Sequence, residues 1–147
     1  MPASPDDSFQ DAFWGAKRAM TDAAELAFAR HGVRAGQQFI LKALWERDGL
    51  TPAEIAQQFD LALPTITKAT TRMEAAGLVT RTPHPTDARR VQIFLTPRGR
   101  ALRRTIAAER RRFTERALDG LSPAERAQLV AWLRRIRANL TGAAPEE

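Results

Sequence analysis

Apolar residues recur at helical spacing along most of the chain. From Ser8 to Arg30 they return every three or four residues, which predicts one long amphipathic helix that Gly32 ends. Residues 35–47 carry a broad apolar face and predict a second, mostly buried helix. Four further helices are predicted over residues 51–59, 64–76, 97–118 and 123–140. The chain is therefore expected to be mainly α-helical.

Three of these helices begin with a hydroxyl residue followed by proline, at Thr51-Pro52, Thr96-Pro97 and Ser122-Pro123. Proline suits the first helical position because no N–H group is needed there. In the first and third cases Glu54 and Glu125 stand three residues after the hydroxyl residue, which completes the pattern of a capping box. The starts of these helices are thus well defined by local sequence.

A different period appears between the fourth and fifth helices. Residues 78–82 and 90–95 predict two strands, the second with alternating Val91, Ile93 and Leu95. The loop between them, residues 83–89, contains two prolines that restrict its backbone. The predicted fold class is mainly α with a small β-hairpin wing, a winged helix-turn-helix flanked by long terminal helices.

The helix at 64–76 has one apolar face and one polar face. Helical spacing turns the following residues outward: Thr65, Thr67, Lys68, Thr71 and Arg72. Hydroxyl groups with a lysine and an arginine suit hydrogen bonding to the base edges and phosphates of DNA. The alternative, a polar face that only meets water, stays open at this point.

The loop of the predicted hairpin adds a second cationic feature. Arg89 stands at its tip, with Arg90 beside it and His84 earlier in the same loop, and all three are candidate DNA contacts. Asp87 would repel phosphate, so we expect it to fix the direction of Arg89 by an ion pair or a turn hydrogen bond. The alternative is a plain Asx turn with a solvated arginine.

Charge and composition narrow the class of partner. Lysine and arginine number 23 against 17 acidic residues, a formal net charge of +6, which favours a polyanionic partner. A soluble protein with a merely basic surface is the alternative. The absence of cysteine excludes disulfides, thiol redox sensing and thiolate metal sites. No apolar run reaches the length of a membrane span and the start of the chain lacks the pattern of a signal peptide, so we expect a cytoplasmic protein.

Catalytic patterns are missing from the sequence. His31 and His84 stand in unrelated contexts, no residue lies in a nucleophile elbow, and no glycine-rich phosphate loop is present. Two histidines with scattered carboxylates do not form a recognisable metal-ligand set. We therefore expect no enzyme activity, no cofactor and no metal.

Four stretches resemble the signature of MarR-family transcriptional regulators. They are LPTITK at 63–68, RMEAAGLVTR at 72–81, DAR at 87–89 and LTPRG at 95–99. The layout of a long leading helix, a winged helix-turn-helix and two long trailing helices is similar to that family over almost the whole chain. The resemblance implies a homodimeric repressor, or less often an activator, that binds double-stranded DNA at a palindromic operator. It further implies release by a small aromatic or phenolic ligand. The alternative is a ligand-independent DNA-binding or architectural protein.

Site residues follow from the resemblance by position. The recognition-helix contacts of the family fall on Thr65, Thr67, Lys68, Thr71 and Arg72. Its minor-groove arginine falls on Arg89, with Asp87 as the orienting partner. The layout also places Trp14, Lys17, Arg18 and Phe39 near a cleft where an anionic aromatic effector would bind. The alternative for Lys17 and Arg18 is the edge of an interface between helices.

The terminal helices favour a homodimer. About 20 residues of helix are roughly 30 Å long, more than a small winged-helix core covers, so their apolar stripes need a partner. Folding back on the same chain is the alternative. We expect residues 1–147 to form a single module, with dimerisation helices at 8–31 and 97–141 and a DNA-binding lobe at 35–96. The first and last seven residues are expected to be frayed tails.

Overall fold

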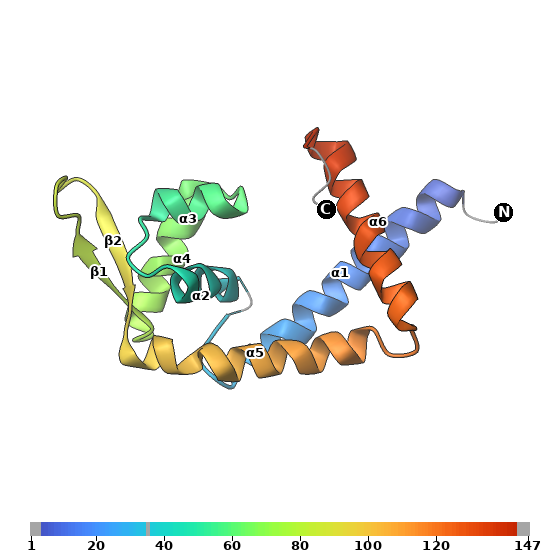
Figure 1. Ribbon diagram of the computed structural model, residues 1–147, viewed down its shortest axis with the longest axis horizontal. Coiled ribbons are helices and arrows are strands. Elements are labelled where there is room, and N and C mark those ends of the chain that lie inside the picture. The colour runs from blue at the N-terminus through green and yellow to red at the C-terminus, as the bar shows by residue number, and fades with distance from the viewer. Residues whose placement is uncertain (1–3, 35, 144–147) are drawn as a thin grey trace. The chain divides into compact units, whose positions relative to one another are not determined.

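The computed structural model describes residues 4–34 and 36–143. The chain divides into two units, Met1–Phe113 and Thr114–Glu147. Helices dominate both units, and one hairpin lies in the first (Figure 1). The order is α1 (Pro5–Ala29), α2 (Gln37–Glu46), α3 (Pro52–Phe59), α4 (Leu63–Ala75), β1 (Val79–Pro83), β2 (Val91–Leu95), α5 (Pro97–Ala117) and α6 (Pro123–Thr141). The predicted mainly α fold with a β-hairpin is confirmed.

Local capping sets the helix starts as expected. Thr51 and Ser122 each accept a hydrogen bond from the backbone of the glutamate three residues on, and both capping boxes are complete. The expectation of a frayed start was wrong for residues 5–7, because Ser4 Oγ accepts from the Asp7 N–H at 3.1 Å and α1 already begins at Pro5. Thr141, also expected to fray, still belongs to α6. Residues 1–3 and 144–147 lie outside the described residues.

The hairpin is tied to the helices on both sides. β1 and β2 pair antiparallel, in a register that runs from Val79 opposite Leu95 to Pro83 opposite Val91. On its other edge β2 meets the segment before α3: the Ile93 N–H donates to the Leu50 carbonyl at 2.8 Å, and the Gly49 N–H donates to the Ile93 carbonyl at 3.0 Å. Figure 1 shows the hairpin beside α4, against which β1 packs. The base of the hairpin is therefore fixed by the main chain.

One apolar core fills the Met1–Phe113 unit. Its largest fully buried side chains include Phe28, Ile40, Leu41, Leu44, Ile55, Ile66, Met73, Leu78, Ile93 and Ile106. α5 contributes Ile106 and Phe113, and the Phe113 ring meets that of Phe28 at 5.7 Å between centroids. Over this part, the expectation that the stripe of the fifth helix lacks a partner in its own chain was wrong, because α5 packs against the end of α1.

α6 in the Thr114–Glu147 unit differs from α5. None of its described residues is buried, and Trp132, Leu133 and Leu140 are 59%, 45% and 83% exposed. Within the unit, Glu115 accepts from Arg126 at 2.9 Å. Between residues 4 and 143, residue 35 excepted, no helix combines the length and apolar character needed to cross a membrane.

Candidate nucleic-acid interface

α4 forms without a side-chain cap. Ala62 precedes it, and the Thr65 and Ile66 N–H groups bond to the Ala62 carbonyl at 3.0 and 3.3 Å. Pro64 presets the helical backbone of the first turn, and Ile66, Thr70 and Met73 are buried. The inward face therefore holds the helix in place.

The outward face of α4 carries the predicted readers of DNA. Thr65, Lys68, Thr71 and Arg72 are exposed, whereas Thr67 is half-buried. Among the described residues, neither Lys68 nor Arg72 has an ion-pair partner. Both charges are therefore available to an incoming polyanion.

Thr71 differs from the other threonines of α4 because its hydroxyl is already engaged. It donates to the Thr67 carbonyl at 2.9 Å and accepts from Arg81 Nη1 at 3.3 Å. Arg81 is not among the site residues that the sequence predicted. The alternation of β1 was the available signal, since it places Arg81 on the same face as buried Val79.

The tip of the wing combines both bonds expected of Asp87. Asp87 Oδ1 accepts from the Arg89 N–H at 3.1 Å and lies 3.5 Å from Arg89 Nε. The Arg89 side chain is nevertheless 94% exposed. Asp87 thus restrains the direction of the Arg89 side chain through the backbone N–H and Nε, while most of the guanidinium donors face water.

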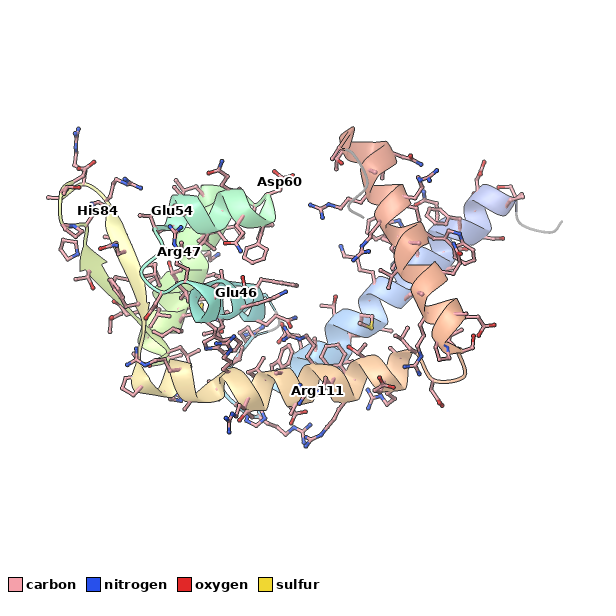
Figure 2. The ribbon with its side chains drawn as sticks, in the orientation of Figure 1. Glu46, Arg47, Glu54, Asp60, His84 and Arg111 are labelled. Atoms are coloured by element: carbon pink, nitrogen blue, oxygen red, sulfur yellow. The ribbon has the colours of Figure 1, made fainter. Side chains whose placement is uncertain are left out.

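His84 closes the same loop. Its backbone N–H donates to the Arg90 carbonyl at 3.0 Å, and its ring Nδ1 accepts from the backbone N–H of Thr86 at 3.2 Å. Figure 2 shows His84 at the wing loop. The ring atom Nδ1 is therefore used within the loop, and Nε2 is the ring nitrogen that could contact DNA.

Arg90 belongs partly to the helices. Its Nη2 lies 3.9 Å from Glu54 Oε1. Glu54 is also bonded to Arg47 at the end of α2, and Figure 2 labels both residues. Burial raises the pKa of Glu54, but the hydrogen bonds from Thr51 and the charges of Arg47 and Arg90 outweigh it, and the pKa is lowered overall. Glu54 therefore stays ionised and links the end of α2, the start of α3 and Arg90, the residue just before β2.

Two arginines at the start of α5 are engaged by the fold. Arg98 donates from Nη1 to the Ala76 carbonyl at 2.7 Å, at the end of α4. Arg100 donates to the Leu95 carbonyl at 3.0 Å and lies 3.8 Å from Asp48. These side chains support the hairpin and the helices around it.

The predicted effector residues form two separate groups among the described interactions. On α1, Lys17 Nζ lies 5.0 Å from the centre of the Trp14 ring, whose Nε1 donates to Gln10, and Arg18 is exposed. Phe39 instead meets the Phe59 ring of α3 at 5.8 Å. No described ring contact or hydrogen bond joins the two groups.

A surface cavity of about 800 Å³ lies along α5. Its lining is Arg103, Arg104, Ala107, Ala108 and Arg111. Figure 2 labels Arg111 on this helix. None of the four predicted effector residues lines it.

A helix-turn-helix with an exposed polar second helix, followed by a hairpin with an exposed arginine at its tip, defines the winged helix-turn-helix class. The family model described as the MarR family matches residues 34–91. The chain is 36% identical to the transcriptional regulator TtmR of Methylorubrum extorquens over 102 residues, which are 69% of this chain and 52% of that protein. The chain therefore spans about half the length of this relative.

Solved structures agree in fold. The transcriptional regulator SlyA matches with a TM-score of 0.79 and 25% identity, over 90% of this chain and 93% of that one. MepR of S. aureus, in a complex with DNA, matches with a TM-score of 0.82 and 24% identity, over 90% and 98% of the two chains. The chain belongs to the MarR family of winged-helix transcriptional regulators. The family and these relatives are regulators and not enzymes.

Proposed function

We propose that this chain is a sequence-specific regulator of transcription that binds double-stranded DNA as a homodimer. In this proposal α4 enters the major groove and Arg89 of the wing enters the adjacent minor groove. The observation that carries the proposal is the pairing of an exposed, cationic α4 face with an exposed arginine that Asp87 steers. The net charge of +6 and the DNA complex of the similar S. aureus protein support it.

DNA selected by the purified protein from a random pool tests this proposal. We expect enrichment of a palindromic site whose halves are about one helical turn apart, because two subunits related by a twofold axis present two copies of α4. Failure to enrich any sequence would overturn the proposal. An enriched site without twofold symmetry would overturn the dimeric part alone.

Substitutions separate shape reading from base reading. Arg89→Ala should weaken binding to sites with A·T-rich flanks, because an arginine in a narrow minor groove responds to its shape and potential. Lys68→Ala and Thr67→Ala should change the preference at particular base pairs, by about 1 to 3 kcal/mol. Arg116→Ala, at the far end of α5, is the matched control. Equal losses on every sequence from all three interface variants would contradict the assignment.

The regulatory proposal is a repressor that a small aromatic or phenolic ligand releases, with Trp14, Lys17, Arg18 and Phe39 as the candidate ligand residues. The adjacent cation and indole on α1 support an anionic aromatic ligand. A ligand releases DNA only through its different affinity for two states, and the expected coupling is about 5- to 150-fold in operator affinity.

A ligand-independent DNA-binding protein is the second candidate, since no described ring contact or hydrogen bond brings Phe39 together with the α1 group. Operator binding measured with a panel of aromatic acids and phenols distinguishes the two. Release by one compound, blunted by joint substitution of Lys17 and Arg18 by alanine, supports the ligand-responsive repressor. No release and no rise in melting temperature across the panel favours the ligand-independent protein.

A further inference from the structure

Arg81 lies on β1 and reaches the recognition helix. β1 alternates between faces, with Val79 buried, Thr80 exposed and Arg81 half-buried. Arg81 is paired with Ile93 in the hairpin register, so it belongs to the strand that continues into the wing loop. A side chain from this position can connect the wing to α4.

Two hydrogen bonds make that connection. The backbone N–H of Arg81 donates to Glu74 Oε2 at 3.0 Å, and the side-chain Nη1 of Arg81 donates to Thr71 Oγ1 at 3.3 Å. Thr71 and Glu74 are three residues apart on α4 and therefore lie on the same side of the helix. One residue of the strand is thus held at two points on successive turns of α4.

The state of the remaining polar atoms argues against Arg81 as an ordinary DNA contact. Its Nε is buried and has no hydrogen-bond partner, so it cannot reach a phosphate in this arrangement. The single hydroxyl proton of Thr71 is donated to the Thr67 carbonyl, so Thr71 in this arrangement has no donor to offer a base. The Thr71 hydroxyl is therefore engaged at both its proton and one lone pair, and the Arg81 guanidinium is tied to it through Nη1.

We propose that Arg81 is a positioning residue for DNA recognition, which acts through Thr71 to hold the wing and α4 as one rigid unit. This inference rests on the proposed function, since it concerns how that interface is held. In it, the Thr71 hydroxyl organises the interface and reads no base, although the family pattern places it among the DNA contacts. Because the unit is already rigid, less conformational entropy is lost when α4 and Arg89 bind DNA together.

A double-mutant cycle on the DNA site selected by the wild-type protein tests the link. Thr71→Val removes the hydroxyl with little change of shape, and Arg81→Met removes the guanidinium but keeps an apolar stem. Each should weaken operator binding by about 3- to 30-fold, and the double variant should be no weaker than the weaker single variant. Thr80→Val, at an exposed threonine of β1 that is not among the predicted DNA contacts, is the matched control and should leave operator binding unchanged. Additive losses would overturn the inference.

Two further measurements separate positioning from a phosphate contact. The slope of affinity against salt concentration should be the same for Arg81→Met and wild type, whereas loss of a phosphate contact lowers it by about one for each subunit. Arg81→Lys keeps the charge but not the planar guanidinium and should fail to restore binding. A lowered slope, or rescue by lysine, would overturn positioning in favour of a direct contact.

The two proposals fail in different ways. If the wild-type protein selects no DNA sequence, the proposed function and this inference both fall. If it selects a site and the Thr71 and Arg81 variants behave additively, only the positioning role falls. Thermal melting of each variant shows whether a loss of binding comes from unfolding. Because Thr71 is exposed, Thr71→Val should disturb folding less than Arg81→Met.

Discussion

Arginines with the same charge have different roles in this protein according to the N–H donors that the fold has already used. The Arg98 guanidinium donates hydrogen bonds to the carbonyls of Ala76 and His31. The Arg81 guanidinium donates one hydrogen bond to Thr71. Arg89 is bonded near its base to Asp87 and stays 94% exposed. Of these three arginines, Arg89 is the one that makes no described bond to a distant element, so its exposed guanidinium can turn toward a partner.

Glu109 makes stability depend on pH. The hydrogen bond from His31, opposed by burial and aided by Arg30 and Arg112, lowers the pKa of Glu109 below its ordinary 4.5. The unfolded chain therefore takes up this proton more readily, and stability is lost as the pH falls through the folded pKa. Wild type should exceed Glu109→Gln in stability at neutral pH by a margin that narrows in acid, measured by urea unfolding from pH 7 to about pH 3.5.

The exposed Glu46 supplies the control for this prediction. Glu46→Gln should leave the pH dependence of unfolding as it is in wild type, because this side chain has no ion pair among the described residues. A margin between wild type and Glu109→Gln that stays constant across the pH range would contradict the role assigned to Glu109.

Gly99 permits the close approach of α5 to the start of the hairpin. A Cβ at this position would lie 2.2 Å from the Leu78 carbonyl oxygen, a backbone atom that cannot turn away. Gly99→Ala should therefore destabilise the protein by about 2 to 3 kcal/mol in urea unfolding. Gly15→Ala on α1 is the control, since nothing lies within 4 Å of its Cβ, and it should be neutral or stabilising. Equal effects of the two changes would refute the packing argument.

At the scale of elements, the start of α3 links helix capping to the wing. Thr51 caps α3, and Glu54 of the same capping box faces Arg47 and Arg90. A short helix of this kind depends on its cap because few of its backbone groups bond within the helix. Local sequence around Thr51 thus supports both the helix and, through Arg90, the end of the wing loop that leads into β2.

Thr51→Ala should cost about 1 kcal/mol of unfolding free energy, because it leaves the Glu54 N–H without its partner. Thr51→Ser keeps the hydroxyl and should cost less, although it loses a buried methyl group. Chemical denaturation of the two variants checks this order. If serine proved as costly as alanine, the buried methyl group and not the cap would account for the effect.

At the scale of the whole molecule, α6 carries apolar side chains that the described chain leaves uncovered. Burying each leucine-sized side chain in an interface contributes about 1.5 to 3 kcal/mol, so Trp132, Leu133 and Leu140 together favour a dimer. Sedimentation at micromolar concentration should find a dimer for wild type. Trp132→Asp combined with Leu133→Asp should shift it to a monomer, and Gln128→Asp should not. A monomeric wild-type protein would contradict this assignment of α6.

Much of the fold could be predicted from the sequence because its signals are local. Helical spacing and the hydroxyl-proline starts predicted the helices to within a few residues, and the alternation of Val91, Ile93 and Leu95 predicted a strand. The bond between Asp87 and Arg89 also spans only two residues. Such interactions depend on backbone geometry close by, which the order of residues alone determines.

Tertiary structure decided how side chains distant in sequence share their bonds. The link from Arg81 to Thr71, the cluster of His31 with Glu109, and the packing of Phe113 on Phe28 all join separate elements. Spacing along one helix shows that a stripe is apolar but not what covers it. The sequence by itself therefore determined which elements form and which faces they offer, and only packing decided which of those faces and donors are left free for a partner.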